Sequence, residues 1–280
     1  MQAVIRLQTM GSIPMSSSVD ASQAVSCCSA FYEQDWVRHL AGDIFHPGGP
    51  DLTHRTIAAM GLQAEARIAD LGCGTGTSAL MLAENPGLNV SAIDISADNI
   101  KRAQDRQLSD GHGLATVQFQ QADAHELPFK DGKFDGVLAE CTFSLFHRQQ
   151  AVLAEVKRVL KPSGQLGITD MAVGGPLPGD IASIVAPWTC LADAVDQQAY
   201  SDMFTNAGFE IREFSNESPA LQNLISLLKR KLLLLGVGTV VAGVNLPKLD
   251  IAEIRYWLDR VASEVEKGTI RYLRFNLQKI

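Results

Sequence analysis

A glycine-rich turn between two apolar segments is the first feature of the chain that could do chemistry. It spans Asp70–Gly76 and contains Gly72, Gly74 and Gly76. Glycines permit a tight turn and let the backbone approach a ligand without a Cβ clash, and the N-terminus of a following helix offers unpaired N–H groups. Two acids, Asp94 and Asp123, end the next two expected strands. A carboxylate there can accept both hydroxyls of a ribose, and the second can accept an adenine amino group. The pattern predicts a ligand that contains adenosine.

The elements that must position these residues alternate regularly. Apolar segments predict strands at 67–71, 89–95, 116–121, 134–139 and 165–170, and helical periodicity fills 52–60, 77–84, 96–108 and 149–160. Such alternation with short connections indicates a parallel sheet that is covered on both faces. After a Gly/Pro-rich stretch at 174–179, we expect a helix at 197–207, a strand at 209–214, mostly helix over 219–267 and a last strand at 269–278. The prediction is an α/β, Rossmann-like, mostly parallel seven-stranded sheet.

The expected organisation has four parts. Residues 1–25 are predicted to be a disordered leader, 26–62 an N-terminal helical cap that includes a helix at 29–40, and 63–215 the ligand-binding core. Residues 216–280 are expected to add a helical insertion and the final strand, packed on the core. The leader lacks the sustained apolar segment of a secretory signal, so we expect a cytoplasmic protein whose thiols face a reducing compartment.

Composition excludes several classes of protein. The chain has 280 residues, a net charge of −7 and no long basic run, so a nucleic-acid partner is not expected. With 5 Cys, 23 Gly and 11 Pro it is not a disulfide scaffold, collagen-like or disordered. The most apolar stretch, 232–244, is shorter than the ~20 residues needed to cross a bilayer. We expect that stretch to form a helix over an active site rather than to contact a membrane.

The glycine turn and the strand-end acids resemble those of the class I S-adenosylmethionine-dependent methyltransferases. The resemblance covers roughly residues 64–215 and includes the turn at 161–164 before the fifth strand. It implies S-adenosylmethionine as the cofactor, with Asp70 near its methionine end and the N–H of Ala124 at its adenine. The implied cofactor-binding residues are Asp70, Gly72, Gly74, Gly76, Asp94, Ile95, Asp123, Ala124 and Glu140. A dinucleotide site is the weaker alternative, because its third glycine follows the spacing G-x-G-x-x-G rather than G-x-G-x-G.

Cysteines lie where an acceptor substrate would meet such a cofactor. Cys141 follows the fourth strand, Cys190 lies in the insertion after the fifth strand, and Cys27 and Cys28 are adjacent in the N-terminal segment. These placements resemble the arsenite methyltransferases, although Thr142 and Glu140 flank Cys141 where that family has Val and Asn. The resemblance implies a trivalent arsenical held by Cys141, Cys190 and either Cys27 or Cys28, with a thiol reductant as a partner.

The chemistry of arsenic suits such a site. Trivalent arsenic is thiophilic, so thiolates from separate segments can position it, and its lone pair can attack the methyl group without a general base. Holding donor and acceptor together then supplies the catalysis, worth up to ~7–11 kcal/mol. The alternative for each cysteine is a buried small hydrophobe, which is the expected role of Cys73.

Two other functions stay open at this point. One is a methyltransferase for the oxygen or carbon of a small organic molecule, with His46, His125, His147 or Glu140 as the base. The other is a non-catalytic metalloid sensor that uses the thiols. Aromatic residues that could line the site are Tyr32, Trp36 and Trp188. The oligomeric state is not predicted.

Overall fold

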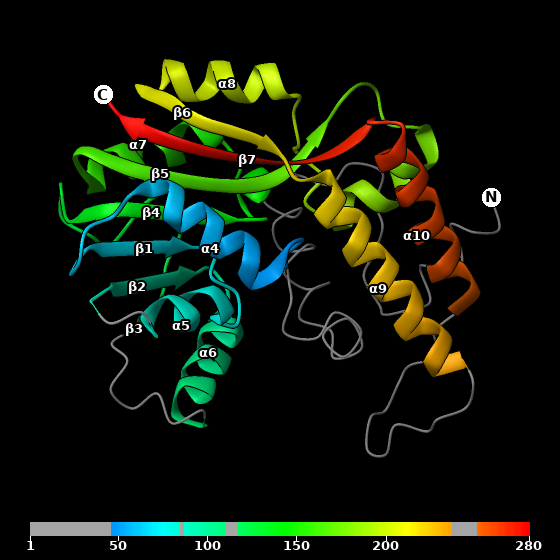
Figure 1. Cartoon of the computed structure of the whole chain (residues 1–280), viewed down its shortest axis with the longest axis horizontal. Helices are drawn as coiled ribbons and strands as arrows, with labels where there is room; N and C mark the ends of the chain where they lie inside the picture. Colours follow the sequence, from blue (N-terminus) through cyan, green and yellow to red (C-terminus); the bar gives the residue numbers. More distant parts are fainter. Residues whose placement is uncertain (1–45, 85–86, 110–116, 237–250) are drawn as a thin grey trace.

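The computed structural model describes residues 46–84, 87–109, 117–236 and 251–280 (Figure 1). The predicted leader, the expected helix at 29–40, Tyr32, Trp36, Cys27 and Cys28 all lie outside these residues. The strands are β1 (Arg67–Leu71), β2 (Asn89–Asp94), β3 (Val117–Gln121), β4 (Phe134–Glu140), β5 (Leu160–Val173), β6 (Phe209–Asn216) and β7 (Ile270–Lys279). The longer helices are α4 (Gly49–Met60), α5 (Thr77–Ala83), α6 (Ala97–Ser109), α7 (Gln149–Val159), α8 (Gln197–Asn206), α9 (Ser218–Gly236) and α10 (Ile251–Glu266).

The seven strands form one mixed sheet with the order β3-β2-β1-β4-β5-β7-β6. Strands β1 to β5 are parallel to one another, whereas β7 is antiparallel to both β5 and β6. The expected α/β, mostly parallel, seven-stranded sheet is therefore confirmed. The final strand lies between β5 and β6, so the C-terminal segment is part of the sheet itself.

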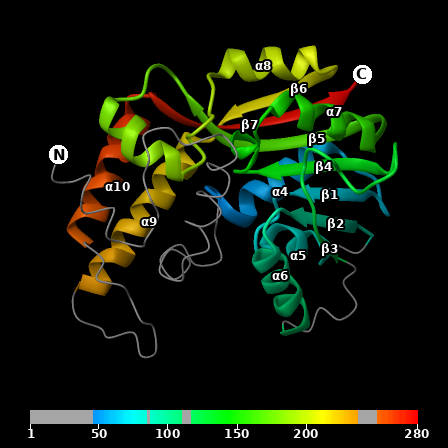
Figure 2. The same ribbon diagram turned by 180° about the vertical axis from the view of Figure 1, so that it is seen from behind.

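Helices cover both faces of the sheet. Helices α4 and α5 lie on one face, and α7 and α8 lie on the other, as the two opposite views show (Figures 1 and 2). Buried aromatic side chains of α8, Tyr200 and Phe204, pack with Phe143 and Phe275 on the second face. The parallel strands thus end in a common carboxyl edge between two helical layers.

The segment between β6 and β7 forms the predicted helical insertion. Helices α9 and α10 pack against each other and lie beyond the carboxyl edge of the parallel strands (Figure 1). Three short helical turns, η1 (Phe143–Leu145), η2 (Ile181–Val185) and η3 (Ala186–Trp188), complete this end of the molecule. The apolar stretch 232–244 begins in α9, where Leu232 is buried and Leu234 is exposed, and the rest of it lies outside the described residues.

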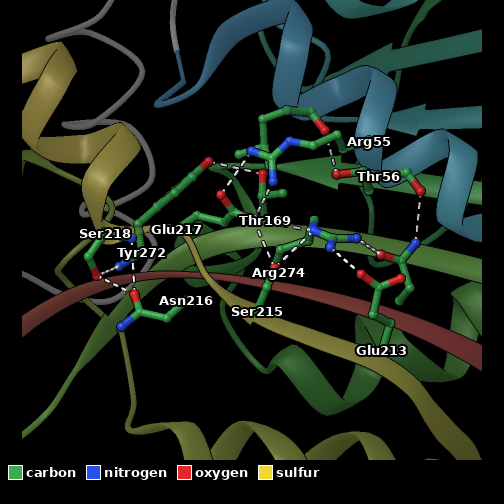
Figure 3. Close-up of polar contacts among 12 residues, drawn as sticks. Arg55, Thr56, Thr169, Glu213, Ser215, Asn216, Glu217, Ser218, Tyr272 and Arg274 are labelled. Atoms are coloured by element: carbon green, nitrogen blue, oxygen red, sulfur yellow. Dashed lines mark hydrogen bonds and ion pairs between the residues drawn. The ribbon is translucent and has the colours of Figure 1, made fainter.

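A partly buried polar network joins α4 and the start of α9 to the antiparallel strands (Figure 3). Arg274 on β7 is 5% exposed and donates to Ser215, Asn276 and Glu213. Glu217, just before α9, accepts two hydrogen bonds of 2.9 Å from Arg55 on α4. The network therefore fixes how the insertion and the helix layer meet the sheet.

Some expected boundaries were wrong. We expected this helix to begin at Leu52, but α4 begins at Gly49. Pro50 is compatible with the first turn of a helix, because a backbone N–H at that position would have no intrahelical partner. The turn expected at 161–164 is included in β5, which starts at Leu160 and runs to Val173. Across the described ranges, the structure contains no helix whose length and apolar character would let it span a bilayer.

Candidate active site

The glycine turn lies at the carboxyl end of β1 and is shaped by close contacts. Gly72, Gly74 and Gly76 all have positive φ, the region that glycine adopts at low cost. A Cβ at Gly72 would lie 2.2 Å from Oγ1 of Thr142, and one at Gly76 would lie 2.8 Å from the Phe119 ring. The turn therefore needs glycine for two reasons, its backbone conformation and the close approach of neighbouring side chains.

Asp70 places a buried carboxylate beside this turn. The residue is 3% exposed, and its Oδ2 has no hydrogen-bond partner among the described residues. Burial raises the pKa of Asp70 well above its usual range, and the nearby charges of Glu140 and Asp94 raise it further. A buried acid with an unpartnered oxygen fits a ligand that carries a positive charge, which S-adenosylmethionine does at its sulfonium and its ammonium group.

The acid that ends β2 shapes the turn from the other side. The carboxylate of Asp94 accepts hydrogen bonds from the backbone N–H of Gly74 at 2.8 Å, from that of Ser96 at 2.9 Å and from the side chain of Asn99 at 3.3 Å. The next residue, Ile95, is 49% exposed. The structure thus places an acid and an exposed apolar side chain together at this edge, where the sequence predicts the ribose and adenine.

The residues expected at the adenine lie after β3. The Asp123 carboxylate is partly exposed and accepts hydrogen bonds from both the backbone and the ring of His125. Partial burial raises the pKa of Asp123, but these hydrogen bonds outweigh it and lower the pKa overall. Ala124 is buried. This segment is therefore held in place by its own side chains.

Glu140, at the end of β4, joins three elements. Its carboxylate accepts hydrogen bonds from Thr53 on α4 at 2.9 Å and from Ser78 on α5 at 2.7 Å. Nε2 of His46 lies 3.6 Å from the same carboxylate and 3.3 Å from the Thr53 hydroxyl. The predicted positions Asp70, Asp94 and Glu140 therefore gather around one turn.

The structure brings two of the predicted cysteines together. The sulfur atoms of Cys141 and Cys190 lie 3.2 Å apart, and the Cys190 thiol also lies 3.1 Å from the Cys141 carbonyl oxygen. The hydrogen bond with Cys190 raises the pKa of Cys141 well above its usual range, and burial adds to this effect. The Cys141 side chain is therefore a protonated thiol near neutral pH. Cys73 packs instead with the apolar residues under α5.

Of the three candidate histidines, His147 alone keeps a ring nitrogen without a partner among the described residues. Both ring nitrogens of His125 are engaged, one by Asp123 and the other by the His147 carbonyl oxygen. Nδ1 of His147 lies 3.5 Å from a carboxylate oxygen of Asp193, and its buried Nε2 has no partner. His147 therefore differs from His46 and His125, whose ring nitrogens all have partners.

Sequence reasoning missed Asp170, which lies within β5 directly after Thr169, the last residue of that strand that pairs with β4. It is 2% exposed, and its carboxylate accepts hydrogen bonds of 2.7 Å from both the backbone and the hydroxyl of Ser144. Burial raises the pKa of Asp170 to about 6, although the Ser144 hydrogen bonds oppose the rise. Asp170 thereby fixes the loop that carries Cys141 and His147. Its position at the end of the expected strand 165–170 was the signal that could have revealed it.

An apolar cluster fills the space between the thiols and the helical insertion, and we call it the acceptor-side cluster. Its buried members are Leu52, Met171, Ile181, Ala186, Cys190, Leu191, Leu221, Ile225, Ala262, Val265, Ile270 and Tyr272. Cys141, Leu145, Trp257 and Leu258 pack against it. The candidate site thus has a charged side at β1, β2 and β4 and an apolar side at the insertion. The side chain of Trp188 lies outside the described part.

Comparison with known proteins decides the class of this site. A family model described as a methyltransferase domain matches residues 62–208. The chain belongs to this methyltransferase family. It is 31% identical over 188 residues to methyltransferase GfsG of Streptomyces halstedii, covering 65% of this chain and 66% of that protein. It is 28% identical over 185 residues to O-methyltransferase resE of Aspergillus sclerotiorum, covering 65% of this chain and 69% of the relative.

Solved structures share the fold of this methyltransferase. The phosphoethanolamine N-methyltransferase 2 of Haemonchus contortus, solved with S-adenosylmethionine, superposes with a TM-score of 0.76 at 20% identity, covering 94% of this chain and 60% of that one. The family confirms the expected class I, S-adenosylmethionine-dependent enzyme, and the unpartnered Asp70 carboxylate agrees with that cofactor. The individual cofactor contacts and the arsenite methyltransferase branch stay predictions.

Proposed function

We propose that this methyltransferase acts on a hydroxyl group of a small, largely apolar organic molecule. The observation that carries the proposal is His147, whose Nδ1 faces Asp193 while its buried Nε2 has no partner among the described residues. A hydroxyl acceptor needs a base, and an imidazole oriented by a carboxylate is a suitable one. Similarity to proteins named O-methyltransferases supports the same acceptor chemistry.

Each group of residues has its own role in the proposed reaction. Asp70, Asp94 and the glycine turn hold S-adenosylmethionine, which supplies an electrophilic methyl group on a positively charged sulfur. The acceptor-side cluster provides the apolar side of the site, against which the organic molecule packs. Nε2 of His147 takes the proton from the acceptor hydroxyl as the oxygen attacks, and Asp193 stabilises the resulting imidazolium. Asp170 keeps the loop that carries His147 in position through Ser144.

Replacing His147 by Gln tests the proposal. We expect the variant to lose about 10²–10⁴-fold in kcat towards a phenolic acceptor, because it removes the base, while its affinity for S-adenosylmethionine stays the same. His54→Gln is the matched control, since His54 is exposed on α4. Turnover of His147→Gln at the wild-type rate would refute the role of His147, and failure of the wild-type enzyme to methylate any hydroxyl would refute the acceptor class.

A trivalent arsenical is a second candidate acceptor, favoured by the 3.2 Å separation of the Cys141 and Cys190 sulfurs. Two thiols at this distance can bind one thiophilic atom after losing their protons. Cys141→Ser and Cys190→Ser are then expected to abolish formation of S-adenosylhomocysteine that depends on arsenite and a thiol reductant, while both variants still bind S-adenosylmethionine. Equal arsenite-dependent turnover in these variants would exclude this candidate.

A further inference from the structure

Helix α10 carries a buried hydrogen-bond donor that nothing in the described structure satisfies. The indole Nε1 of Trp257 is buried and has no hydrogen-bond partner among the described residues. The ring packs against the acceptor-side cluster, and the Tyr256 ring contacts it edge-on with centroids 5.1 Å apart. The donor therefore lies in apolar surroundings within a helix that packs on α9 and β7.

The other polar side chains in this cluster are paired. The Tyr272 hydroxyl donates to Oγ1 of Thr169 at 2.9 Å, and the thiols of Cys141 and Cys190 contact each other. An unpaired buried N–H costs about 1–3 kcal/mol, and native proteins keep few of them. A hydrogen-bond acceptor placed at the indole N–H would therefore remove this cost, and the described residues do not supply one.

The position of α10 indicates where that partner comes from. β7 follows α10 and begins at Ile270, which pairs with Val173 at the carboxyl end of β5. Two other buried atoms without partners belong to Asp70, at the carboxyl end of β1, and His147, in the segment that follows β4. Because Trp257 packs against the cluster that contains Cys190, all three side chains belong to the end of the molecule where a cofactor and an acceptor meet.

We propose that the indole N–H of Trp257 is a specificity-determining donor that binds an oxygen atom of the acceptor, a carbonyl or ether oxygen other than the hydroxyl that is methylated. This inference rests on the proposed function, since it adds a second oxygen to the apolar acceptor proposed there. The acceptor class becomes apolar molecules that carry a hydroxyl at one point and a hydrogen-bond-accepting oxygen at another. A molecule without the second oxygen leaves the indole unpaired and binds less well.

Two phenols of the same size test this selectivity. 4′-Hydroxyacetophenone and 4-ethylphenol share the hydroxyl and the ring, and they differ in the carbonyl oxygen. We expect the ratio of their kcat/KM values to fall about 5- to 100-fold in Trp257→Phe relative to wild type, mainly through KM, because Phe keeps an aromatic ring but cannot donate. Comparing ratios between the two enzymes cancels the different acidities of the phenols. An unchanged ratio would overturn the inference.

A binding measurement separates this inference from the proposed function. Acetophenone and ethylbenzene carry no hydroxyl and cannot be methylated, so they probe the site without any reaction. In protein with ¹⁵N-labelled indoles and bound S-adenosylhomocysteine, the signal absent from Trp257→Phe identifies the Trp257 N–H. We expect acetophenone to move this proton signal downfield more than ethylbenzene does. Equal or absent displacement would overturn the inference, whether or not phenols are methylated.

Discussion

The buried carboxyl of Asp170 makes the stability of the fold depend on pH in a defined direction. Its pKa is about 6 in the folded chain against an ordinary value of 3.8, chiefly because of burial and in spite of the hydrogen bonds from Ser144. The folded state therefore binds this proton more tightly than the unfolded state. The associated stabilisation is fully present below pH 3.8 and is lost as the pH rises through about 6.

The size of the effect follows from the pKa values. One pKa unit corresponds to about 1.4 kcal/mol, so the rise to about 6 is worth about 3 kcal/mol in the free energy of unfolding. Asp170→Asn has a side chain of nearly the same shape that does not titrate. We expect the free energy of unfolding of wild type, relative to this variant, to fall by about 2 kcal/mol between pH 4 and pH 7, because part of the effect lies below pH 4.

Urea unfolding of both proteins at several pH values measures this difference directly. Other titrating groups act on both chains alike, so the subtraction isolates Asp170. The prediction is wrong if the free energies of unfolding of the two proteins differ by the same amount at every pH. It is also wrong if wild type becomes more stable relative to the variant as the pH rises.

Three further variants follow from the geometry. Asp70→Asn removes a buried carboxylate without a partner among the described residues, so we expect calorimetry to show S-adenosylmethionine binding about 10- to 150-fold weaker, and chemical denaturation at neutral pH to show a more stable free protein. Gly72→Ala places a Cβ 2.2 Å from Oγ1 of Thr142 at a positive φ, which should cost about 1–3 kcal/mol of stability in the same assay and weaken cofactor binding. Arg274→Met leaves Glu217 and its neighbours without their buried cation and is expected to cost about 3–5 kcal/mol in urea unfolding. If a variant keeps the stability and cofactor affinity of wild type, the role assigned to the replaced residue is wrong.

Local features of the sequence predicted much of the fold. Strand–helix alternation indicated the parallel part of the sheet, and the glycine turn could be placed because its positive φ values are a property of a few adjacent residues. The antiparallel position of β7 between β5 and β6 depends on pairing between distant segments, such as Ile270 with Val173, and local patterns do not encode it.

The candidate site was predicted in a similar way. The rule that strand ends meet at one edge predicted the positions of Asp94 and Cys141, whereas Asp70 and Glu140 were assigned from the resemblance to the methyltransferases. In the structure Asp94 lies at the glycine turn, and Cys141 lies beside Cys190. The same rule applied to Asp170 would have found it. The unpaired donor of Trp257 could not be predicted, because it depends on how α10 packs in three dimensions.

The central claim is that this methyltransferase transfers the methyl group of S-adenosylmethionine to a hydroxyl of an apolar molecule. The most direct test incubates the protein with S-adenosylmethionine that carries a deuterated methyl group and, in separate reactions, with a panel of phenols or with arsenite and a thiol. Mass spectrometry then detects the labelled methyl group in each product. We expect labelled methyl ethers of phenols that carry a second oxygen, and label on arsenic with no labelled ether would contradict the account.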